Sequence, residues 1–466
     1  GWFDGTLRYG NTTIESLGKA GFALQMNHTN GEILHHYVLD SDILDWNDYI
    51  YGIDILEGGG VVMAGSSKGN LTNQSQGKNN ATCSQICAVI AVLNDNLTVQ
   101  EFTFVSGNKG VVAKDVAQHT ITNSLIIVGN FLEDLQFDGA SIFPPSSNGK
   151  SDIFVAEYVI GQGWTNSITV GGAGTDVPHS ITKVGSNHFI SAHVTHQTTP
   201  LNVSSGQSIS STVGGKDILL LEVDSSANYL SHRIIGSTGD DYPGDLTFVD
   251  SSFVAVTGVM GGELLVDNNT IGQNGQNNLL LAKIDKSGQG NDKFFISNGS
   301  GSSDGRGNGI TGIGNNSLIL GGRLAPGTTY IDGSNVGGTT ETGVILMVFE
   351  DTDNDGIAQP IDNCPHIYNP LQNNHEGDSL GDLCDDDIDN DGIENANDNC
   401  PMGETYWSST VENDWDQDGC KDDEAGETDI DNDGITNAHD DCMRGTTGNE
   451  IHDLANDRDA DGCFDN

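Results

Sequence analysis

One short apolar strand recurs through the first 350 residues at almost constant intervals, and this repeat limits the folds open to the chain. It reads GVVMAG from Gly60, LIIVGN from Leu125, FISAHV from Phe189, FVAVTG from Phe253 and LILGGR from Leu318, with offsets of 65, 64, 64 and 65 residues. Apolar runs this short, bounded by Gly, Asn, Asp and Ser, are typical of strands buried on both faces. We therefore expect one β unit, repeated along the chain.

A second apolar strand keeps the same interval, with copies that start at Gly21, Cys87, Asp152, Asp217, Asn278 and Gly343. Each interval also holds a shorter strand, such as DLTFVD at 245–250, and a variable polar strand. Four-stranded antiparallel units repeated radially form a β-propeller. Tandem β-sandwiches are the alternative, but a sandwich needs about seven strands and about 100 residues. We predict an all-β fold in which residues 1–350 form a propeller of five to six four-stranded blades.

These units resemble the bacterial β-propeller repeat family. The matching segments are GSTGDDYPGDLTFVDSSFVAVTG at 236–258, KSDIFVAEY at 150–158 and NNLLLAKID at 277–285. The resemblance covers nearly all of residues 1–350 and implies the propeller fold. It implies little about activity.

The repeat leaves a half unit at the start of the chain. Residues 2–26 carry only the last two strands of a unit, ahead of five complete units from about 50 to 349. An unpaired blade edge is a template for strand addition. We expect the missing strands to come from a removed upstream segment, from a neighbouring copy or from the last blade of the same chain. Head-to-tail addition by neighbouring copies would build a filament.

Residues 351–466 form a second domain with a different composition. They hold 34 acidic and 3 basic residues, against 33 and 15 in the first 350. The motif Asp-x-Asp-x-Asp-Gly recurs there, with another carboxylate near the twelfth position. Calcium takes six to eight oxygen ligands, and alternate residues of a tight loop can direct successive carboxylates to one ion. We predict a calcium-binding array that holds up to about six ions.

The candidate ligands fall into three regular and three irregular copies of the motif. The regular copies are Asp351, Asp353, Asp355 with Asp362; Asp387, Asp389, Asp391 with Asp398; and Asp429, Asp431, Asp433 with Asp440. The irregular copies are Asn374, Glu376, Asp378 with Asp382 and Asp385; Asp414, Asp416, Asp418 with Asp422 and Glu424; and Asp457, Asp459, Asp461 with Asp465. A disordered acidic tail is the alternative, but random acidity would not place Gly and Cys in phase with Asp.

Six of the eight cysteines lie in this acidic region at spacings of 20, 20 and 21 residues. They are Cys364 with Cys384, Cys400 with Cys420, and Cys442 with Cys463. We predict three local disulfides that tie the calcium loops together in pairs. A zinc cluster is the alternative, but it needs cysteine pairs two to four residues apart. Cys83 and Cys87 could close a small loop ahead of a strand.

The acidic region resembles thrombospondin type 3 repeats, most closely at 351–387. The resemblance implies that the family's calcium-binding Asp positions fall on the Asp residues named above, and its paired cysteines on Cys364 and Cys384. Asn374 and Glu376 stand where Asp is usual, and Ser379 replaces the Gly. EF-hand and dockerin loops use a similar spacing, but the flanking helices they need are not indicated between motifs so close together.

The cysteine pairs indicate an oxidising, extracellular or cell-surface location. The sequence has Asn-x-Ser/Thr sequons, which permit glycosylation, at Asn11, Asn27, Asn70, Asn73, Asn80, Asn96, Asn202, Asn268, Asn298 and Asn315. A formal charge of −49 disfavours nucleic-acid and membrane-surface partners, and no apolar run reaches the roughly 18 residues of a membrane helix. Gly1 carries no methionine or leader, so we expect a processed terminus or a fragment.

No catalytic motif stands out. His193 and His196 lie three residues apart in HVTHQ, and we interpret them as surface-loop residues. Asp48, Asp176, Asp241 and Asp304 recur at one point of the repeat, which indicates a structural turn, since catalytic groups are usually singular. No nucleophile elbow, phosphate loop or zinc-protease helix is found.

We therefore expect a non-enzymatic, calcium-binding structural protein of the cell surface that self-assembles into a filament or surface layer. A carbohydrate- or protein-binding adhesin is the first alternative. A calcium-dependent propeller hydrolase, such as a phytase or glycosidase, is the second.

Overall fold

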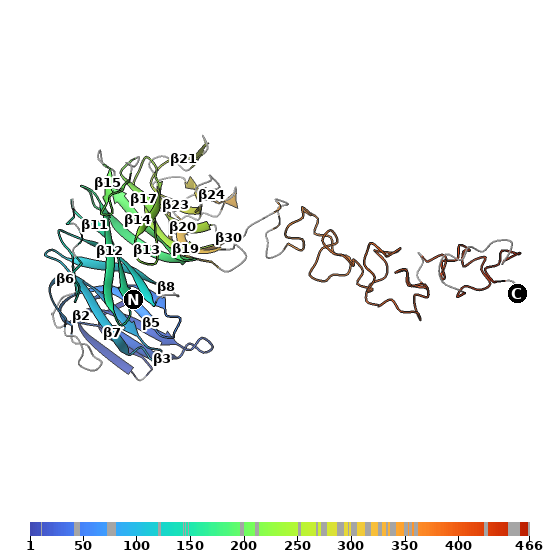
Figure 1. The fold of residues 1–466 in the computed structure, drawn as a ribbon, viewed down its shortest axis with the longest axis horizontal. Helices are drawn as coiled ribbons and strands as arrows, with labels where there is room; N and C mark the ends of the chain where they lie inside the picture. The colour runs from blue at the N-terminus through green and yellow to red at the C-terminus, as the bar shows by residue number, and fades with distance from the viewer. Residues whose placement is uncertain are drawn as a thin grey trace. The chain divides into compact units, whose positions relative to one another are not determined.

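The computed structural model divides the chain into two compact units, Gly1–Val348 and Phe349–Asn466 (Figure 1). The structure describes all residues except 11, 42–46, 72–80, 120–122, 143, 145, 148, 196–199, 210–213, 250–252, 267–268, 272–276, 287–292, 297, 300–304, 313–317, 325–328, 332–333, 336–341, 349–352, 354–356, 358–361, 424–426, 446–456 and 465–466. Among the described residues no helix is long and apolar enough to cross a membrane.

The first unit is a series of antiparallel sheets, most of which run in chain order. The N-terminal sheet contains β1 (Trp2–Tyr9), β2 (Thr12–Met26) and β3 (Ile33–Leu39). The second contains β4 (Tyr49–Ile55), β5 (Val61–Leu71), β6 (Ala81–Leu93) and β7 (Val99–Ser106), with β10 (Gln136–Phe137) beside β7. The third contains β8 (Val111–His119), β9 (Ser124–Phe131), β11 (Asp152–Val159) and β12 (Gly163–Gly171), extended by β15 (Leu201–Val203) and β16 (Ser208–Ile209).

The remaining sheets follow the same order. The fourth contains β13 (Val177–Val184), β14 (Asn187–Thr195), β17 (Lys216–Val223) and β18 (Tyr229–Ile235), and the fifth contains β19 (Tyr242–Phe248), β20 (Phe253–Met260), β23 (Asn278–Asp285) and β24 (Lys293–Ile296). The last contains β26 (Arg306–Gly312), β27 (Leu318–Leu324) and β30 (Thr342–Val348). Short pairings involve β21 (Leu264–Val266), β22 (Asn269–Ile271), β25 (Asn298–Gly299), β28 (Thr329–Ile331) and β29 (Ser334–Asn335).

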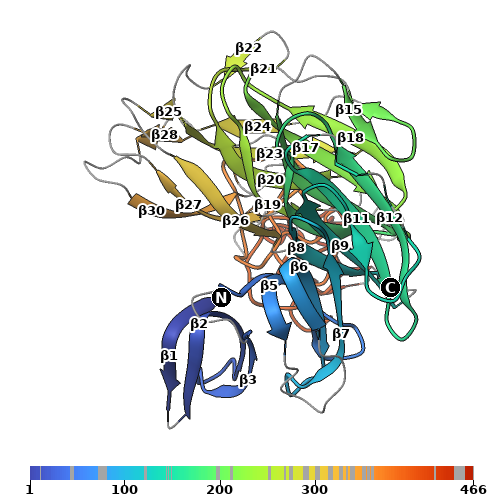
Figure 2. The ribbon, with the colours of Figure 1, turned by 90° about the vertical axis from the view of Figure 1, so that its left-hand side faces the viewer.

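The prediction of an all-β fold is confirmed for the described residues, and the two repeated apolar strands are the second and third strands of the five sheets that begin with β4, β8, β13, β19 and β26. Successive sheets follow one another along an arc from β1 to β30 (Figure 2). The described strands show no closed ring of sheets, so a complete propeller is not part of the observed fold.

The N-terminal half unit differs from the prediction in its extent. We expected two strands within residues 2–26, but a third strand, β3, pairs with β2 from Gly21 to Met26. Its sequence, ILHHYVL, has two histidines at its centre and lacks the continuous apolar run of the strands that are covered on both faces, so the repeat pattern does not reveal it. β1 pairs only with Thr12 to Gly21 of β2.

Side chains packed between neighbouring sheets form the core. One cluster joins the second and third sheets around Val62, Ile90, Ile127 and Phe154, all fully buried. Comparable clusters lie between each later pair of sheets. Because the second and third strands are covered on both faces, they read as continuous apolar runs in the sequence.

The first strands of the sheets, β4, β8, β13, β19 and β26, are adjacent to one another in chain order. Each carries a β-bulge against its second strand at the same place, which falls at Tyr51, Lys114, His179, Gly244 and Asn308. A bulge bends the strand and redirects the side chain of the extra residue. The sequence pattern does not reveal these bulges, because the first strands are short and chemically diverse.

Buried aspartates lie directly before the first strands of several sheets and hold these strands in place by hydrogen bonds. The recurrent set is Asp48, Asp176, Asp241 and Asp304, of which the structure describes the first three. The Asp241 carboxylate accepts bonds from the Ser237 amide at 2.6 Å and the Gly261 amide at 2.7 Å, so it joins the end of one sheet to the second strand of the next. Asp176 bridges the Gly172 and Thr195 amides in the same way. Burial raises the pKa of Asp176 to about 6.

Candidate metal centres

The second unit has no helix or strand over its described residues and is built from turns. Left-handed backbone at Asn390 and Gly392, with φ of 59° and 99°, coils one loop tightly, and Asn432 and Gly434 repeat it at 55° and 93°. Gly suits such φ values because it lacks the Cβ atom that clashes there. Each loop thereby brings alternate aspartates to its inner side.

The loop at 387–398 shows how the carboxylates are arranged. Asp387, Asp389 and Asp391 place oxygens within 4.8 Å of one another. Each uses one oxygen for the backbone: Asp387 accepts the Gly392 amide at 3.1 Å, and Asp391 accepts the Ile393 amide at 2.7 Å. The other oxygen of each of the three aspartates is buried and has no hydrogen-bond partner.

The twelfth-position carboxylate completes this loop. Asp398 accepts the Cys400 amide at 2.6 Å through Oδ1 and leaves Oδ2 buried without a partner. Unpartnered buried carboxylate oxygens cost free energy unless a cation or proton compensates them. The donor set is all oxygen, which calcium prefers. The predicted ligands of this loop therefore fit a calcium ion.

The loop at 429–440 repeats these contacts. Asp429, Asp431 and Asp433 also place oxygens within 4.8 Å of one another. Asp429 accepts the Gly434 amide at 3.0 Å, and Asp440 accepts the Cys442 amide at 2.6 Å. The two loops are nearly identical in sequence, DIDNDGIENAND and DIDNDGITNAHD, and they share one hydrogen-bond pattern.

Two irregular copies also gather carboxylates. Glu376, Asp378 and Asp385 form one group and Asp414, Asp416 and Asp418 form another. Asn374 and Asp382 support the first loop, because they accept the Gly377 and His375 amides at 2.6 and 2.7 Å. In the third irregular copy, Asp457 accepts the Gly462 amide at 3.2 Å and Asp461 accepts the Cys463 amide at 3.0 Å, while Asp459 is exposed.

Mutual repulsion within these groups is visible in their pKa values. Burial and the neighbours Asp385 and Asp378 raise the pKa of Glu376 to about 7, and burial with Asp418 and Asp414 raises that of Asp416 to about 7. Carboxylates held this close are stable as anions only beside a positive charge. A divalent cation would supply it.

One predicted ligand, Asp422, has other hydrogen-bond partners in the structure. Both oxygens of Asp422 are engaged, one by the Trp415 amide at 3.0 Å and the other by Arg444. Glu427, which the motif did not include, lies instead with Asp418. Glu427 precedes Asp429 by two residues, as Asp385 precedes Asp387, and both acids accept the amide of the later residue. That shared spacing is the signal that could have identified Glu427.

Several predicted site residues lie outside the described residues. They are Asp351, Asp355, Glu424 and Asp465 among the ligands, and Asn11, Asn73, Asn80, Asn268 and Asn315 among the sequons, while the side chain of Asn298 is also not described. Asn70, Asn96 and Asn202 are exposed and Asn27 is half-buried. Asp353 and Asp362 of the first regular copy are described, and Asp362 accepts the Cys364 amide at 2.9 Å.

Disulfides join the loops in pairs. The structure contains the bonds Cys364–Cys384, Cys400–Cys420 and Cys442–Cys463, and Cys83–Cys87 in the first unit. Around Cys400–Cys420, the Asn399 amide donates to the Asp418 carbonyl at 2.7 Å. A Cβ atom at Gly419 would lie 2.1 Å from Asp398 Oδ1, so this glycine lets one loop touch the next. The candidate metal sites of the two neighbouring loops are therefore held together by a disulfide and by direct backbone contact.

Replacing Glu427 tests its place among the ligands. Glu427→Gln keeps an oxygen for the Asp429 amide but removes the charge, so we expect calcium affinity at the Asp414 loop to fall at least tenfold. Equilibrium dialysis with radioactive calcium measures the effect. Glu412→Gln, an exposed acid of the same loop region, is the matched control and should change nothing. Equal calcium binding by both variants would remove Glu427 from the site.

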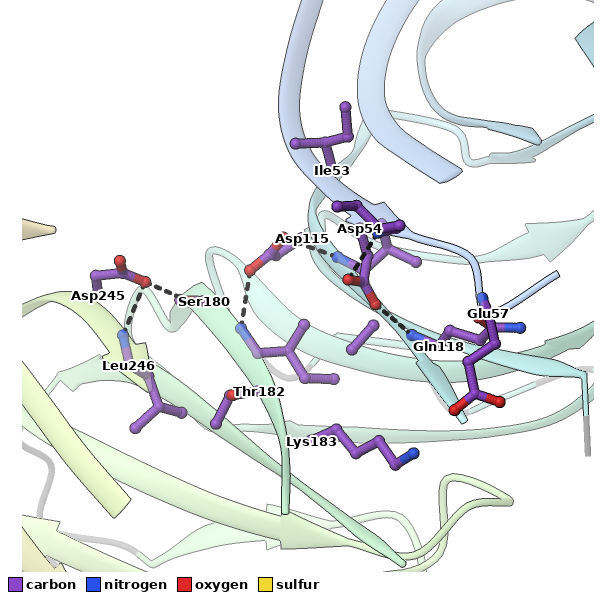
Figure 3. A pocket seen from close by; sticks show the side chains of 14 residues that line it. Ile53, Asp54, Glu57, Asp115, Gln118, Ser180, Thr182, Lys183, Asp245 and Leu246 are labelled. Atoms are coloured by element: carbon purple, nitrogen blue, oxygen red, sulfur yellow. Dashed lines mark hydrogen bonds between the residues drawn. The ribbon is translucent and has the colours of Figure 1, made fainter. Parts of the chain in front are cut away.

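A separate polar pocket of about 410 Å³ lies on the first strands of the first unit (Figure 3). Three of its four carboxylates, those of Asp54, Asp115 and Asp245, are engaged by the fold. Asp54 accepts the Gln118 amide at 2.8 Å, and Asp115 accepts the Ile181 amide at 2.9 Å. Asp245 accepts the Ser180 hydroxyl at 2.8 Å. These bonds tie adjacent first strands together. Burial raises the pKa of Asp115 to about 7.

His193 corrects another interpretation. We expected a surface loop, but it lies in β14 and is 8% exposed, with Nδ1 2.8 Å from Nε2 of His179. His196 lies outside the described residues.

The chain matches the family model of the thrombospondin type 3 repeat over residues 350–372 and 374–403. This match supports the repeat interpretation of the acidic region, whose carboxylate groups are those described above. No curated protein matches the chain.

The solved structures found to be similar include two variants of apocarotenoid oxygenase from Synechocystis. One has a TM-score of 0.33 at 10% identity, covering 70% of this chain and 71% of the other, and the second has 0.32 at 10%, covering 74% of each. A likeness this weak carries no argument about fold or activity.

Proposed function

We propose that the protein is an extracellular, non-enzymatic structural protein whose acidic unit is held folded by several calcium ions and three disulfides. The observation that supports it best is the convergence of buried, unpartnered carboxylate oxygens in successive loops. Metal and disulfide replace an apolar core there, since large apolar side chains such as Leu371, Leu383 and Tyr406 are more than 60% exposed. An extracellular location would supply millimolar calcium for the metal sites and oxidising conditions for the disulfides.

We further propose that the first unit is an incomplete propeller whose N-terminal edge binds a second copy. The residue two positions after the bulge in the first strand packs against the preceding sheet in four cases: Val116, Ile181, Leu246 and Ile310 are 2%, 7%, 4% and 7% exposed. The equivalent Ile53 is 55% exposed. In the other four cases the preceding sheet covers the equivalent residue. The sheet before β4, which is β1-β2-β3, has no described strand at the covering position.

The edge of β2 beside this surface is also incomplete. Phe22 exchanges both backbone bonds with Gly1, at 2.8 and 3.0 Å. From Ala23 to Met26, β2 pairs only with β3 within the described residues, and Met26 is 58% exposed. An open edge next to exposed apolar side chains favours addition of a strand pair. Repeated head to tail between copies, such addition gives a filament.

Electron microscopy and light scattering with calcium test this assembly. We expect polymers from the parent chain, and a mostly monomeric Ile53→Glu variant, because a charge on the contact surface is costly to bury. Leu230→Glu is the matched control, since Leu230 is 45% exposed on β18 of a different sheet. A monodisperse parent chain, or an Ile53→Glu variant that polymerises like the parent, would contradict assembly through this edge.

A further inference from the structure

Two lysines and two histidines from separate strands gather in the first unit. Lys114 and His179 occupy the bulges of β8 and β13. His193 lies in β14 opposite the start of β13, and Lys216 begins β17. We call these four residues the Lys-His cluster. The bulges matter because they redirect the Lys114 and His179 side chains.

Direct contacts hold the cluster together. His179 Nε2 lies 2.8 Å from His193 Nδ1, and the His193 ring packs edge-on against Tyr242 with 5.1 Å between centroids. Lys216 Nζ donates to the Tyr242 hydroxyl at 2.9 Å. Positive charge on Lys114 and Lys216 lowers the pKa of both histidines, after the larger effect of burial, so all four groups share one electrostatic environment.

The cluster has little compensating negative charge. Within the described residues, no carboxylate lies within ion-pair distance of the Lys114 or Lys216 ammonium groups, although the chain has 67 acidic residues and 18 basic ones. The carboxylate closest to the cluster by hydrogen bonding is exposed Asp240, which accepts the Tyr242 hydroxyl at 3.3 Å. Asp115 on β8 and Asp245 on β19 are engaged by backbone amides and Ser180.

An aromatic surface adjoins the cluster. Lys114 Nζ lies 4.4 Å from the centre of the Tyr51 ring, and Tyr51 stacks on Tyr49 at 5.5 Å. Tyr51 is 45% exposed, and Lys114, His179 and Lys216 are half-buried, so the group is open to solvent on one side. Aromatic faces beside polar groups are suited to stacking on the apolar face of a sugar ring.

From this arrangement we propose that the Lys-His cluster binds a compact oxyanion, a sulfate or carboxylate group, carried on a sugar that stacks against Tyr51. Two half-buried ammonium groups supply the charge, and the imidazole N–H that the His179–His193 hydrogen bond leaves free supplies a neutral donor. This site shares no residue with the calcium array, and its Tyr51 lies on β4 two residues from Ile53 of the proposed assembly surface. It would give the structural protein a means of holding acidic glycans.

The sign of the histidine response follows from electrostatics. Burial and the two lysines lower the pKa of His179 to about 4 and of His193 to about 3. A bound anion favours the charged imidazolium, so it raises both values toward 6.5. A purely structural cluster would show no such change.

Calorimetry and histidine NMR of the full chain, in fixed calcium at low ionic strength, test the proposal with sodium sulfate, glucuronate and glucose. We expect sulfate and glucuronate to bind and to raise the histidine pKa values, and glucose to do neither. Lys114→Gln/Lys216→Gln should weaken binding at least tenfold, and Lys114→Arg should retain it. Lys109→Gln, a substitution of an exposed lysine paired with Glu133, is the control.

Three results distinguish the outcomes. Binding of glucuronate but not sulfate identifies a carboxylate-specific sugar site, and binding of both identifies a general oxyanion site. Unchanged histidine pKa values, or equal binding by the parent and the double variant with the same thermal unfolding, would overturn the proposal. Unfolding curves for all variants separate loss of the site from loss of the fold.

Discussion

Removing calcium with a chelator is expected to make residues 350–466 sensitive to proteases while the first unit stays resistant. Without cations the carboxylates of each loop repel one another, and the unit has no apolar core to keep it closed. Buried oxygens such as those of Glu376 and Asp389 then become solvated as the loops open. We expect the rate of cleavage in this region to rise at least a hundredfold, measured by limited proteolysis and mass spectrometry.

The control for this experiment lies in the same chain. Gly1–Val348 has clusters of fully buried apolar side chains, so its cleavage rate should not depend on calcium. Magnesium added in place of calcium tests the ion's identity, because magnesium demands octahedral geometry and loses water reluctantly. We expect it to protect poorly. An acidic unit that resists proteases equally with and without chelator would be inconsistent with folding driven by metal.

Removing the central disulfide is expected to have the second largest effect. Cys400→Ser/Cys420→Ser opens a cross-link between residues 20 apart, and closing a loop of this length stabilises a fold by about 3 kcal/mol. Because the same bond connects the loop of Asp398 with that of Asp418, we expect the calcium concentration for half-maximal protease protection to rise about a hundredfold.

A matched pair of variants isolates this coupling. Cys83→Ser/Cys87→Ser removes the disulfide of the first unit, which lies within β6, and should leave the calcium requirement unchanged. If the Cys400 and Cys420 variant needs no more calcium than the parent chain, the two loops bind their ions independently.

The sequence predicted most of the strands because a strand that is buried on both faces consists of a continuous run of apolar residues. LIIVGN and DIFVAEY, for example, became β9 and β11, with Ile127 and Phe154 fully buried. It also predicted the calcium loops, because a fixed spacing of Asp and Gly is what a tight loop around one ion requires.

Contacts between distant segments could not be predicted. The bulge that redirects Lys114 and His179 depends on pairing with the second strand, which no local pattern records. For the same reason His193 was assigned to a loop, although packing against His179 and Tyr242 buries it.

Ligands that depart from the motif were the hardest to assign. Glu427 and Asp422 are both acidic and lie near the same loop, but only their three-dimensional partners distinguish them. Arg444, which follows the next loop in the sequence, pairs with Asp422. The spacing of the motif does not indicate this pairing. The repeat pattern also could not show whether the sheets close into a ring, because local periodicity does not determine where the two ends of the arc lie.

Equilibrium dialysis of the full chain against radioactive calcium is the most direct test of the central claim. The account predicts at least one ion for each of the groups at Asp385, Asp389, Asp416 and Asp431, all bound at extracellular calcium concentrations. It also predicts that the number falls when their carboxylates are changed to amides. A chain that binds no calcium under these conditions, while its acidic unit remains compact, would contradict the account.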